Sequence, residues 1–551
     1  MGRAPSGIVA STPWVGDRDD KMRPKALAKN LLGKLPLAAE IDWLLRRRDK
    51  RLHGRFRLHV LETQLPELMV QVLPYVSSRP TGKKIFFFAS WHYWIVHTAL
   101  CGLTLRGLGH DVTLGYLPYG DYDKPIDNFD LRRQDLYTQH ILKKARPLLK
   151  AISFLDLLPA HKIPEVLTEA VRKVTIYDTQ YALQREDVTG NEPIYQLRRQ
   201  RNLEAARKAF AYFQKHRPDV VIIPNGMIQE YGAVYEAARA LDIPTSTYEF
   251  GEQDQRAWLA QNQPVMYFNE MDALWEARRT RKLDKEQRAW LESFLAARQG
   301  LSTGDKFAHL WQKTDREGGA KTRAHLGLDN RPVVLLPTNV LGDSATLGRA
   351  VFSRSSSEWI ERVVPFFANR HEVQLVVRIH PAETWTVGPS VADIIRIVLP
   401  ELPSHIHMIG PKEKVNTYDL MDIADLALVY TTHAGLEMAT RGIPVLVSGG
   451  AHYRKRGFTL DADTWEEYFQ ELELALAGLP DHRLTPEQIE CAWNYAYSFF
   501  CEYPQPFPWH LEKIGADLEK RPLSYILSQD GRAEFVTTFQ SMAGTQLDWI
   551  A

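Results

Sequence analysis

The sequence predicts an α/β protein with two domains, each built on a parallel sheet with helices on both faces. The length of 551 residues favours two domains over one. Short apolar runs alternate with amphipathic stretches in both halves of the chain, as in repeated strand–helix units. Several of these runs end in small, polar or charged residues, and a parallel sheet presents its ligand-binding groups at those strand ends.

The composition narrows the class of protein. A hydrophobic content of 44% and a charged content of 25% are ordinary for a globular protein, and a net charge of +1 argues against a nucleic-acid partner. The three cysteines lack CxxC spacing, which argues against a zinc cluster, and their small number fits a reducing, cytoplasmic compartment. No apolar run reaches the roughly 18 residues of a membrane-spanning helix.

Residues 1–80 predict a basic helical extension. Leu and Ile recur at helical spacing from Lys25 onward, and Lys and Arg cluster between Arg46 and Arg57. In one interpretation, residues 25–60 dock on the inner face of a membrane, because clustered cations gain about 1 kcal/mol each near anionic lipid. In the other, the helix packs on the body of the protein and its basic face is solvated.

Residues 81–320 predict the first α/β domain. Strand 83–90 leads into a helix and a second strand, and no GxGxxG lies at the turn, so the dinucleotide fingerprint is absent. The turn carries aromatic residues that either stack on a sugar or only pack: Trp91, Tyr93 and Trp94. Strands 220–224 and 245–248 follow, and the charged helical stretch 270–330 contains the change of domain.

Candidate catalytic groups of this domain lie at or after the strand ends. Glu249 follows strand 245–248, Glu230 lies on the helix after strand 220–224, and His92 follows strand 83–90. We favour Glu249, because it sits where the sheet should face a cleft. Two further acids remain candidates, Asp121 and Glu252.

We predict that residues 321–482 form the second α/β domain. We expect residues 483–551 to form a C-terminal helix that packs back across the cleft, followed by a tail. The second domain has apolar runs at 333–337, 373–381, 405–410, 426–430 and 444–448, with helical stretches between them. The C-terminal helix is expected from about 486 to 520, and the tail from Pro522 is unassigned.

A first candidate phosphate site follows the strand that ends at RIHPAE. His380 can donate a hydrogen bond to a phosphate oxygen, and Pro381 fixes the turn. Arg378 points to the same side of the strand and can add a charge-assisted bond, and Glu383 can orient either group. The alternative is a strand-end histidine whose hydrogen bonds go to the backbone.

A second candidate site is the turn TTHAG between a strand and a helix. Thr431 and Thr432 offer hydroxyls, and the backbone around Gly435 offers N–H groups at a helix N-terminus, which favours an anion. Glu437 on the same helix can accept hydrogen bonds from ribose hydroxyls. The alternatives are simple N-capping and an ordinary surface glutamate.

The loop HYRKRGFT places cations after the next strand. Tyr453 and Arg456, with Arg454 and Lys455 between them, could offset the charge of a leaving group without a metal. The alternative is a solvated basic loop. No DxD flanked by apolar residues and no calcium-binding loop occurs, so we expect neither a metal nor another cofactor.

Four motifs in order, TNVLGDS, RIHPAE, TTHAGLEMATRGIPV and HYRKRGFT, resemble those of bacterial capsule and surface polysaccharide biosynthesis glycosyltransferases. The resemblance covers about 333–465 and implies the GT-B architecture, in which two Rossmann-like domains face a cleft. Within this group, the sequence is similar to capsular Kdo transferases and related enzymes that use CMP-linked acidic sugars. In those enzymes a His-Pro pair and a hydroxyl pair hold the donor. Here a Thr pair stands where a Ser commonly comes first, so UDP and GDP donors stay open.

The resemblance implies inverting transfer of a sugar from a nucleotide-sugar to a glycan or lipid-linked acceptor, with a carboxylate of the first domain as the base. Three alternatives remain: a sugar-nucleotide epimerase of the same fold, a polyol-phosphate transferase, and a non-catalytic scaffold of capsule assembly.

Overall fold

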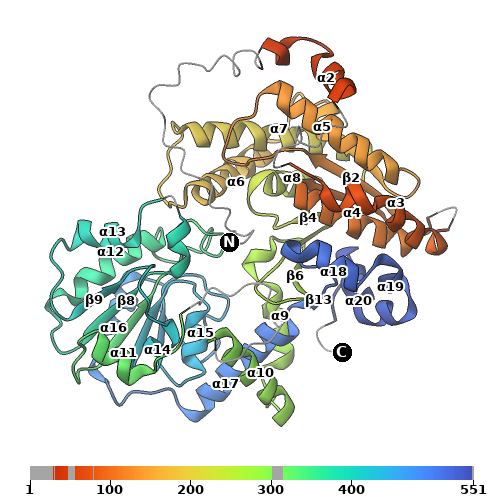
Figure 1. Cartoon of the computed structure of the whole chain (residues 1–551). Coiled ribbons are helices and arrows are strands. Elements are labelled where there is room, and N and C mark those ends of the chain that lie inside the picture. Colours follow the sequence, from red (N-terminus) through yellow and green to blue (C-terminus); the bar gives the residue numbers. More distant parts are fainter. Residues whose placement is uncertain are drawn as a thin grey trace.

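Two α/β domains lie side by side, and the C-terminal helices run back from the second domain to the first (Figure 1). The computed structural model describes residues 29, 31–46, 56–77, 80–300, 314–386 and 388–548. Each domain contains a mainly parallel sheet with helices packed against it, so the predicted fold class is confirmed.

The first sheet has the order β13-β6-β5-β4-β1-β2-β3. The strands β1 to β5 pair in parallel, whereas β6 and β13 add an antiparallel edge. Across the sheet, the five parallel strands therefore lie in the order 5-4-1-2-3, where the numbers give their order in the chain. This is the doubly wound order, and its switch point lies between β1 and β4. The strands are β1 (Lys84–Ser90), β2 (Asp111–Leu117), β3 (Lys150–Ser153), β4 (Val220–Pro224), β5 (Thr245–Glu249), β6 (Arg256–Gln261) and β13 (Gln505–Pro506).

Helices cover this sheet and continue the chain toward the second domain. They are α2 (Ala38–Arg46), α3 (His59–Val72), α4 (His92–Gly107), α5 (Asn128–Leu142), α6 (Glu165–Leu183), α7 (Pro193–Lys215), α8 (Gln229–Arg239), α9 (Glu270–Arg278) and α10 (Lys285–Arg298).

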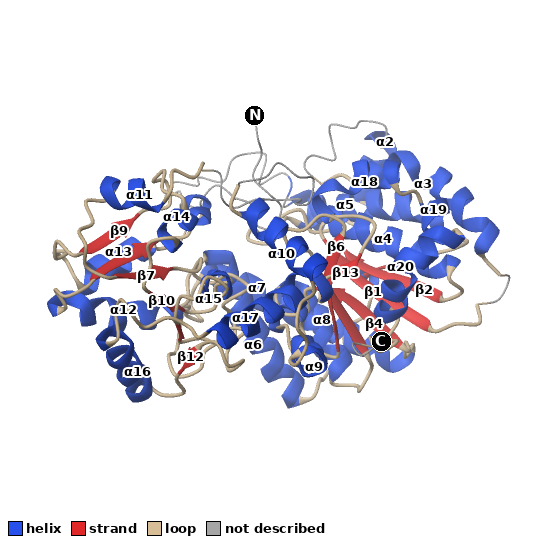
Figure 2. Ribbon diagram, turned by 90° about the horizontal axis from the view of Figure 1, so that it is seen from below, coloured by secondary structure: helices blue, strands red, loops and turns tan. Residues whose placement is uncertain are grey.

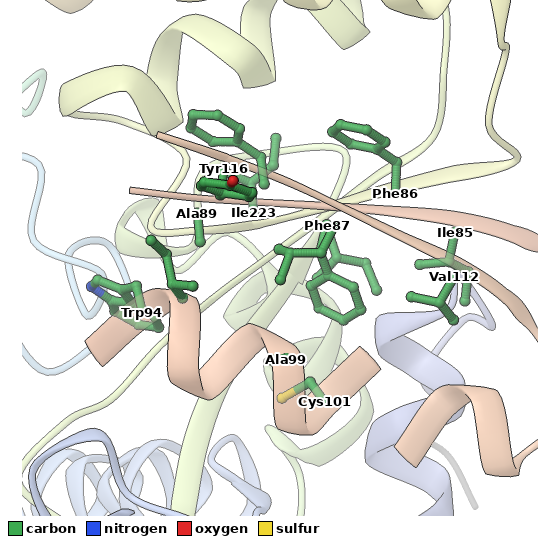
Figure 3. Close-up of a cluster of buried hydrophobic side chains, with 14 of the residues drawn as sticks. Ile85, Phe86, Phe87, Ala89, Trp94, Ala99, Cys101, Val112, Tyr116 and Ile223 are labelled. Atoms are coloured by element: carbon green, nitrogen blue, oxygen red, sulfur yellow. The ribbon is translucent and has the colours of Figure 1, made fainter. Parts of the chain in front are cut away.

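The core of the first domain is formed around β1. Phe86 and Phe87 point to opposite faces of the sheet, as alternation along a strand requires (Figure 3). Phe87 faces helix α4, from which Ala99 and Cys101 approach the sheet (Figure 3). The strand is therefore buried on both sides, which explains its uninterrupted apolar sequence.

The second sheet has the order β12-β11-β10-β7-β8-β9, and all its pairs are parallel. Numbered within the domain this is 6-5-4-1-2-3, the Rossmann order, and its switch point lies between β7 and β10. The strands are β7 (Val333–Pro337), β8 (Gln374–Arg378), β9 (Ile406–Ile409), β10 (Leu426–Val429), β11 (Val445–Val447) and β12 (Leu460–Asp461). Its helices are α11 (Gly319–His325), α12 (Ser356–Phe366), α13 (Val391–Val398), α14 (Thr417–Met421), α15 (Ala434–Ala439) and α16 (Trp465–Ala477).

The C-terminal segment corrects one prediction, because it is not one helix from 486 to 520. Helix α17 (Pro486–Tyr497) packs against α10 between the two domains, and after a short π-helical turn the chain pairs with β6 through β13 (Figure 2). The reason is the run of prolines at 504, 506 and 508, which cannot continue a helix. The segment expected to be a tail folds as α19 (Leu523–Leu527) and α20 (Gln529–Met542) after α18 (Ile514–Lys520), on the first domain.

The N-terminal extension is helical where the structure describes it. Helix α2 packs along α5, and Glu40 of α2 forms an ion pair with Arg132 of α5. Arg46 forms an ion pair with Asp42 at 3.4 Å. Most of the basic cluster lies outside the described residues, namely Arg47, Arg48, Lys50, Arg51 and Arg55. Among the described helices, none combines the length and the apolar character needed to cross a membrane.

Candidate functional site

A cavity of about 420 Å³ lies between the two domains, at the carboxyl ends of both sheets. Residues that follow β1, β4 and β5 line one side, and residues that follow β7, β8 and β10 line the other. The volume is that of a small-molecule site, and the position is the crevice where doubly wound sheets bind ligands.

On the second-domain side, His380 lies directly after β8 and lines the cavity. Its Nδ1 accepts a hydrogen bond from the backbone N–H of Ala382 at 3.1 Å, and its backbone N–H donates to Thr338 Oγ1 at 3.1 Å. Burial, with the charge of Arg378, lowers the pKa of His380 to about 4, so the ring is neutral near pH 7. Because Nδ1 accepts, Nε2 carries the proton and is the donor.

The other residues of this motif support the wall of the cavity. Arg378 lines the cavity, but its guanidinium donates to the carbonyls of Gly410 at 2.7 Å and Val415 at 3.2 Å. Pro381 lines the cavity beside His380, whereas Glu383 does not and accepts from the backbone N–H of Val391 at 3.1 Å. Glu383 therefore holds the start of α13.

The Thr431–Thr432 turn follows β10, and both threonines line the cavity. Thr431 is held in place by its backbone N–H, which donates to Asn339 Oδ1 at 3.2 Å. Asn339 follows β7, so this hydrogen bond joins the two strands at the switch point. Thr432 Oγ1 accepts from the N–H of Ala434 at 3.4 Å, but the N-cap residue of α15 is His433, which makes no side-chain cap, so Thr432 is not the N-cap.

Two residues of the predicted set lie behind this turn. Tyr453 is buried, and its hydroxyl donates to the carbonyl of Thr432 at 2.6 Å. A Cβ on Gly435 would lie 2.3 Å from that hydroxyl oxygen, so only glycine fits there. Both residues shape the turn without lining the cavity.

Glu437 lines the cavity and is paired with a residue that the sequence reasoning missed. Arg298, the last residue of α10, lies 3.0 Å from the Glu437 carboxylate and is also paired with Glu252. The network joins α15, α10 and the loop after β5. Arg298 falls in the stretch interpreted as linker, so no motif marked it. A ribose bound at Glu437 has to share that carboxylate with Arg298.

The basic loop does not line the cavity, which corrects the prediction that it offsets leaving-group charge. Arg456 is paired with Asp272 of α9. Arg454 and Lys455 both reach Asp463, at 2.9 and 2.6 Å. The cations are neutralised by nearby acids, and only Lys455 is largely exposed, so the loop is held by ion pairs and differs from the solvated basic loop of the alternative as well.

On the first-domain side, Glu249 ends β5 and lines the cavity. Its carboxylate accepts from Asn225 Nδ2 at 3.2 Å and from the backbone N–H of Phe250 at 3.0 Å. Burial raises the pKa of Glu249 to about 7. A carboxylate with this pKa is suited to accept a proton near neutral pH.

The other two candidate bases are not at the cavity. Glu230 is buried and paired with Arg198 at 2.9 Å, which also contacts Asp178 at 2.6 Å. His92 packs its ring against Phe56 with the centroids 6.0 Å apart, and burial lowers its pKa to about 4. Both residues serve the packing of the first domain, so the structure does not support either as the base.

The further candidate acids and an unpredicted one complete the site. Glu252 lines the cavity but is paired with Arg298, whereas Asp121 does not line it. Asp343, after β7, lines the cavity, and burial raises its pKa. It belongs to the motif TNVLGDS, for which the sequence predicted no individual residue roles. Within the described ranges, no three His, Cys, Asp or Glu side chains are placed to hold a metal ion.

Backbone strain is concentrated at the first-domain side of the cavity. Trp91, Asn225 and Gln229 all line it, with φ angles of 70°, 57° and 57°. A non-glycine residue in such a conformation costs about 1–3 kcal/mol, and strain of this kind clusters at functional sites. Asn225 uses its conformation to reach Glu249.

Residues 302–484 match the family model described as capsule polysaccharide biosynthesis protein. The match contains the whole set of four motifs, so the resemblance drawn from them is confirmed. No curated protein matches the chain.

Solved structures with similar folds include two chains of Thermosulfurimonas dismutans KpsC. The beta Kdo 2,4 transferase has 16% identity and a TM-score of 0.33, over 50% of this chain and 78% of that chain. The beta Kdo 2,7 transferase has 14% identity and a TM-score of 0.31, over 52% and 79%. A UDP-GlcNAc 2-epimerase from Neisseria meningitidis, bound to UDP-GlcNAc, has 12% identity and a TM-score of 0.24, over 76% and 99%. Likenesses this distant carry no conclusion about the activity of this chain.

Proposed function

We propose that the protein is a glycosyltransferase that moves a sugar from a nucleotide-sugar to a capsular or other surface glycan acceptor. The observation that carries the proposal is the pairing of two unlike walls in one cavity. Glu249, with a pKa of about 7, faces it from the first domain, and His380 and the Thr431–Thr432 turn face it from the second. A base and an anion-binding wall are the two parts that transfer to a hydroxyl requires.

In the proposed inverting reaction, the acceptor hydroxyl oxygen attacks the anomeric carbon of the donor sugar. The Glu249 carboxylate takes the proton of that hydroxyl, and the bond between the anomeric carbon and the phosphate oxygen breaks. The nucleotide leaves with the bonding electrons, while His380 Nε2–H and the Thr432 hydroxyl donate to its phosphate; the Thr431 hydroxyl donates to the carbonyl of Ala345 at 3.2 Å and stiffens the turn. The basic loop takes no part in this version of the mechanism.

A CMP-linked acidic sugar is the donor that the motif resemblance favours. Binding calorimetry with CMP, CDP, UDP and GDP tests it, and we expect CMP to bind tightest. A preference for UDP or GDP would reassign the donor. No binding of any nucleotide would overturn the transferase proposal and favour a scaffold.

Incubation of the enzyme with nucleotide-sugar alone and with added glycan acceptors separates the enzymatic alternatives. We expect nucleotide release to depend on acceptor. A new sugar nucleotide formed without acceptor identifies an epimerase, and transfer of a polyol phosphate identifies the other alternative.

We further propose that the N-terminal extension docks on an anionic membrane surface, where a lipid-linked acceptor would be found. Seven of the fourteen exposed large hydrophobic side chains in the described part of the chain lie between 31 and 45. Leu44 and Leu45 on α2 are 64% and 80% exposed, and two cations next in sequence to these apolar side chains are exposed as well, Arg46 after Leu45 and Lys34 before Leu35. Apolar side chains flanked by cations match the chemistry of an anionic bilayer surface.

Co-sedimentation with vesicles tests this docking. We expect binding to phosphatidylglycerol-containing vesicles and loss of binding in a Leu44→Glu, Leu45→Glu variant. Ile397→Glu is the matched control, since Ile397 is 78% exposed on α13 of the other domain. Equal binding of both variants, or no preference for anionic lipid, would refute the proposal.

A further inference from the structure

An aromatic wall lies at the switch point of the first sheet. Trp91 and Tyr93 follow β1, and Tyr181 comes from the end of α6; these three residues, called the aromatic wall below, all line the cavity. The switch point between β1 and β4 is where a doubly wound sheet opens a crevice for a ligand. None of the donor motifs lies on this wall.

The rings of the wall are arranged around one another. The ring centroids of Trp91 and Tyr93 are 5.3 Å apart, and the two ring planes are nearly perpendicular, at 88°. Tyr122 lies behind the wall, 5.2 Å from Trp91 and 6.1 Å from Tyr181. The rings therefore hold each other in place and form an apolar surface beside the cavity, as carbohydrate-binding platforms do when they stack on the C–H face of a pyranose.

Two polar atoms of the wall are buried without a partner. Trp91 Nε1 and the Tyr93 hydroxyl have no hydrogen-bond partner among the residues that the structure describes. Buried donors are nearly always paired in folded proteins, so a ligand that accepts hydrogen bonds is the simplest missing partner. The backbone of Trp91 gives independent support, because its φ of 70° and ψ of 146° belong to a region that glycine normally occupies.

The wall adjoins the proposed base. Burial, then Tyr122 and Glu249, raise the pKa of the Tyr93 hydroxyl, which places Tyr93 within electrostatic reach of the Glu249 carboxylate. Asp343 and Glu249 act on Tyr181 in the same way. A sugar stacked on the wall would therefore have its hydroxyls beside Glu249.

The charges around the wall disfavour an anionic ligand. The acids nearest to it, Glu249 and Asp343, have no arginine partner within the described residues. The cavity arginines are engaged elsewhere: Arg298 with two carboxylates, Arg378 with two backbone carbonyls, and Arg256 with the carbonyl of Pro504 at 3.0 Å. A carboxylate or phosphate on the ligand would meet acids and no available cation.

We infer that the aromatic wall is a subsite for an uncharged pyranose, which stacks on its rings and accepts hydrogen bonds from Trp91 Nε1 and the Tyr93 hydroxyl. The inference rests on the proposed function only in making this sugar the acceptor: its hydroxyl beside Glu249 is the one that attacks. The subsite then determines that the acceptor ends in a neutral sugar.

Saturation-transfer NMR with methyl β-galactopyranoside, methyl β-glucopyranoside and methyl β-glucuronide tests the subsite. We expect saturable binding of at least one neutral glycoside and at least about tenfold weaker binding of the glucuronide. The Trp91→Phe, Tyr93→Phe variant retains two rings but lacks both donors, so its affinity for the neutral glycoside should fall about tenfold. Trp465→Phe, on α16 of the second domain, is the matched control and should bind like wild type.

Nucleotide binding, measured on the same samples, keeps the two proposals apart. We expect it to be unchanged in the double variant, because the wall belongs to the opposite domain from the donor motifs. Absence of nucleotide binding by the wild-type protein would overturn the proposed function. The glycoside affinities would still show whether the subsite exists. Wild-type glycoside affinity in the double variant, equal binding of the glucuronide, or no binding of any neutral glycoside would overturn the subsite.

Discussion

Replacement of Glu249 by glutamine tests the centre of the proposed mechanism. Glutamine has nearly the shape of glutamate, and its amide oxygen can still accept from Asn225, 3.2 Å away in wild type. The change removes the negative charge and the ability to take a proton. Loss of a general base lowers turnover by about 10²–10⁴-fold. Donor affinity should not change, because the donor wall belongs to the second domain.

The same substitution has a calculable effect on stability. Burial raises the pKa of Glu249 from 4.5 to about 7, and each pKa unit corresponds to 1.36 kcal/mol, so ionising the buried group costs at most about 3 kcal/mol. Because the folded-state pKa lies above the unfolded value, wild type is stabilised by the bound proton below pH 4.5 and loses this stability as the pH rises to 7. The glutamine variant has no such loss. It should therefore gain up to about 3 kcal/mol relative to wild type between pH 4.5 and pH 8.

Urea unfolding at pH 5 and pH 8, with acceptor-dependent nucleotide release, measures both effects. Wild-type kcat/KM should fall below pH about 7 as Glu249 becomes protonated. Glu230→Gln is the informative comparison, because it leaves Arg198 with one carboxylate partner fewer and should lower stability at every pH near neutrality. A Glu249→Gln variant with wild-type turnover, or a folded Glu230→Gln variant without turnover, would refute the assignment of the base.

Three further predictions concern the donor side. His380→Ala should weaken nucleotide binding about tenfold, and it should leave the pH dependence of binding between pH 8 and pH 5 unchanged, since the His380 pKa is about 4; a titration near pH 6.5 that is present in wild type and lost in the variant would contradict this. Transfer should survive EDTA, measured as nucleotide release before and after chelation, and its restoration by Mg²⁺ would show a metal requirement. Gly435→Ala should destabilise the fold by about 1–3 kcal/mol in thermal or urea unfolding, because its Cβ would meet the Tyr453 hydroxyl oxygen at 2.3 Å. Tyr453→Phe should relieve part of that cost, and the absence of relief would place the clash elsewhere.

The strand ends could be predicted because the information is local. Apolar runs of five residues followed by His380 or Thr431 signal a buried strand and its exposed tip without knowledge of the partners. The order of the strands could not be read in this way, because hydrophobic pattern does not say which strand pairs with which. That order decides which tips meet. It brings Thr431 to Asn339, 92 residues away in the chain, across β7 and β10.

The errors have the same physical origin. The basic loop resembles an anion site because the acid that pairs with Arg456, Asp272, lies 184 residues earlier, and because the sequence does not show that Arg454 and Lys455 turn toward Asp463. Arg298 was overlooked because a charged helical stretch resembles a linker until its partners, Glu252 and Glu437, are known. The broken C-terminal helix is a different case, since the prolines from 504 to 508 were visible in the sequence and outweigh helical periodicity.

The two sheets place their sites at the same topological point, and this explains how the work is divided. In each domain the first strand has the fourth as its neighbour, so the chain leaves the sheet in opposite directions on either side of that pair. In the proposed mechanism the second domain offers uncharged hydrogen-bond donors to the nucleotide phosphate, from His380 and Thr432, while Arg378 and Glu437 at the same wall are engaged by other groups of the protein. The first fills its own with aromatic rings and the Glu249 carboxylate, which would repel the phosphates of a nucleotide. A base next to the donor phosphates would be held protonated or would weaken donor binding, so the proposed reaction is best served by a base on the opposite wall, such as Glu249.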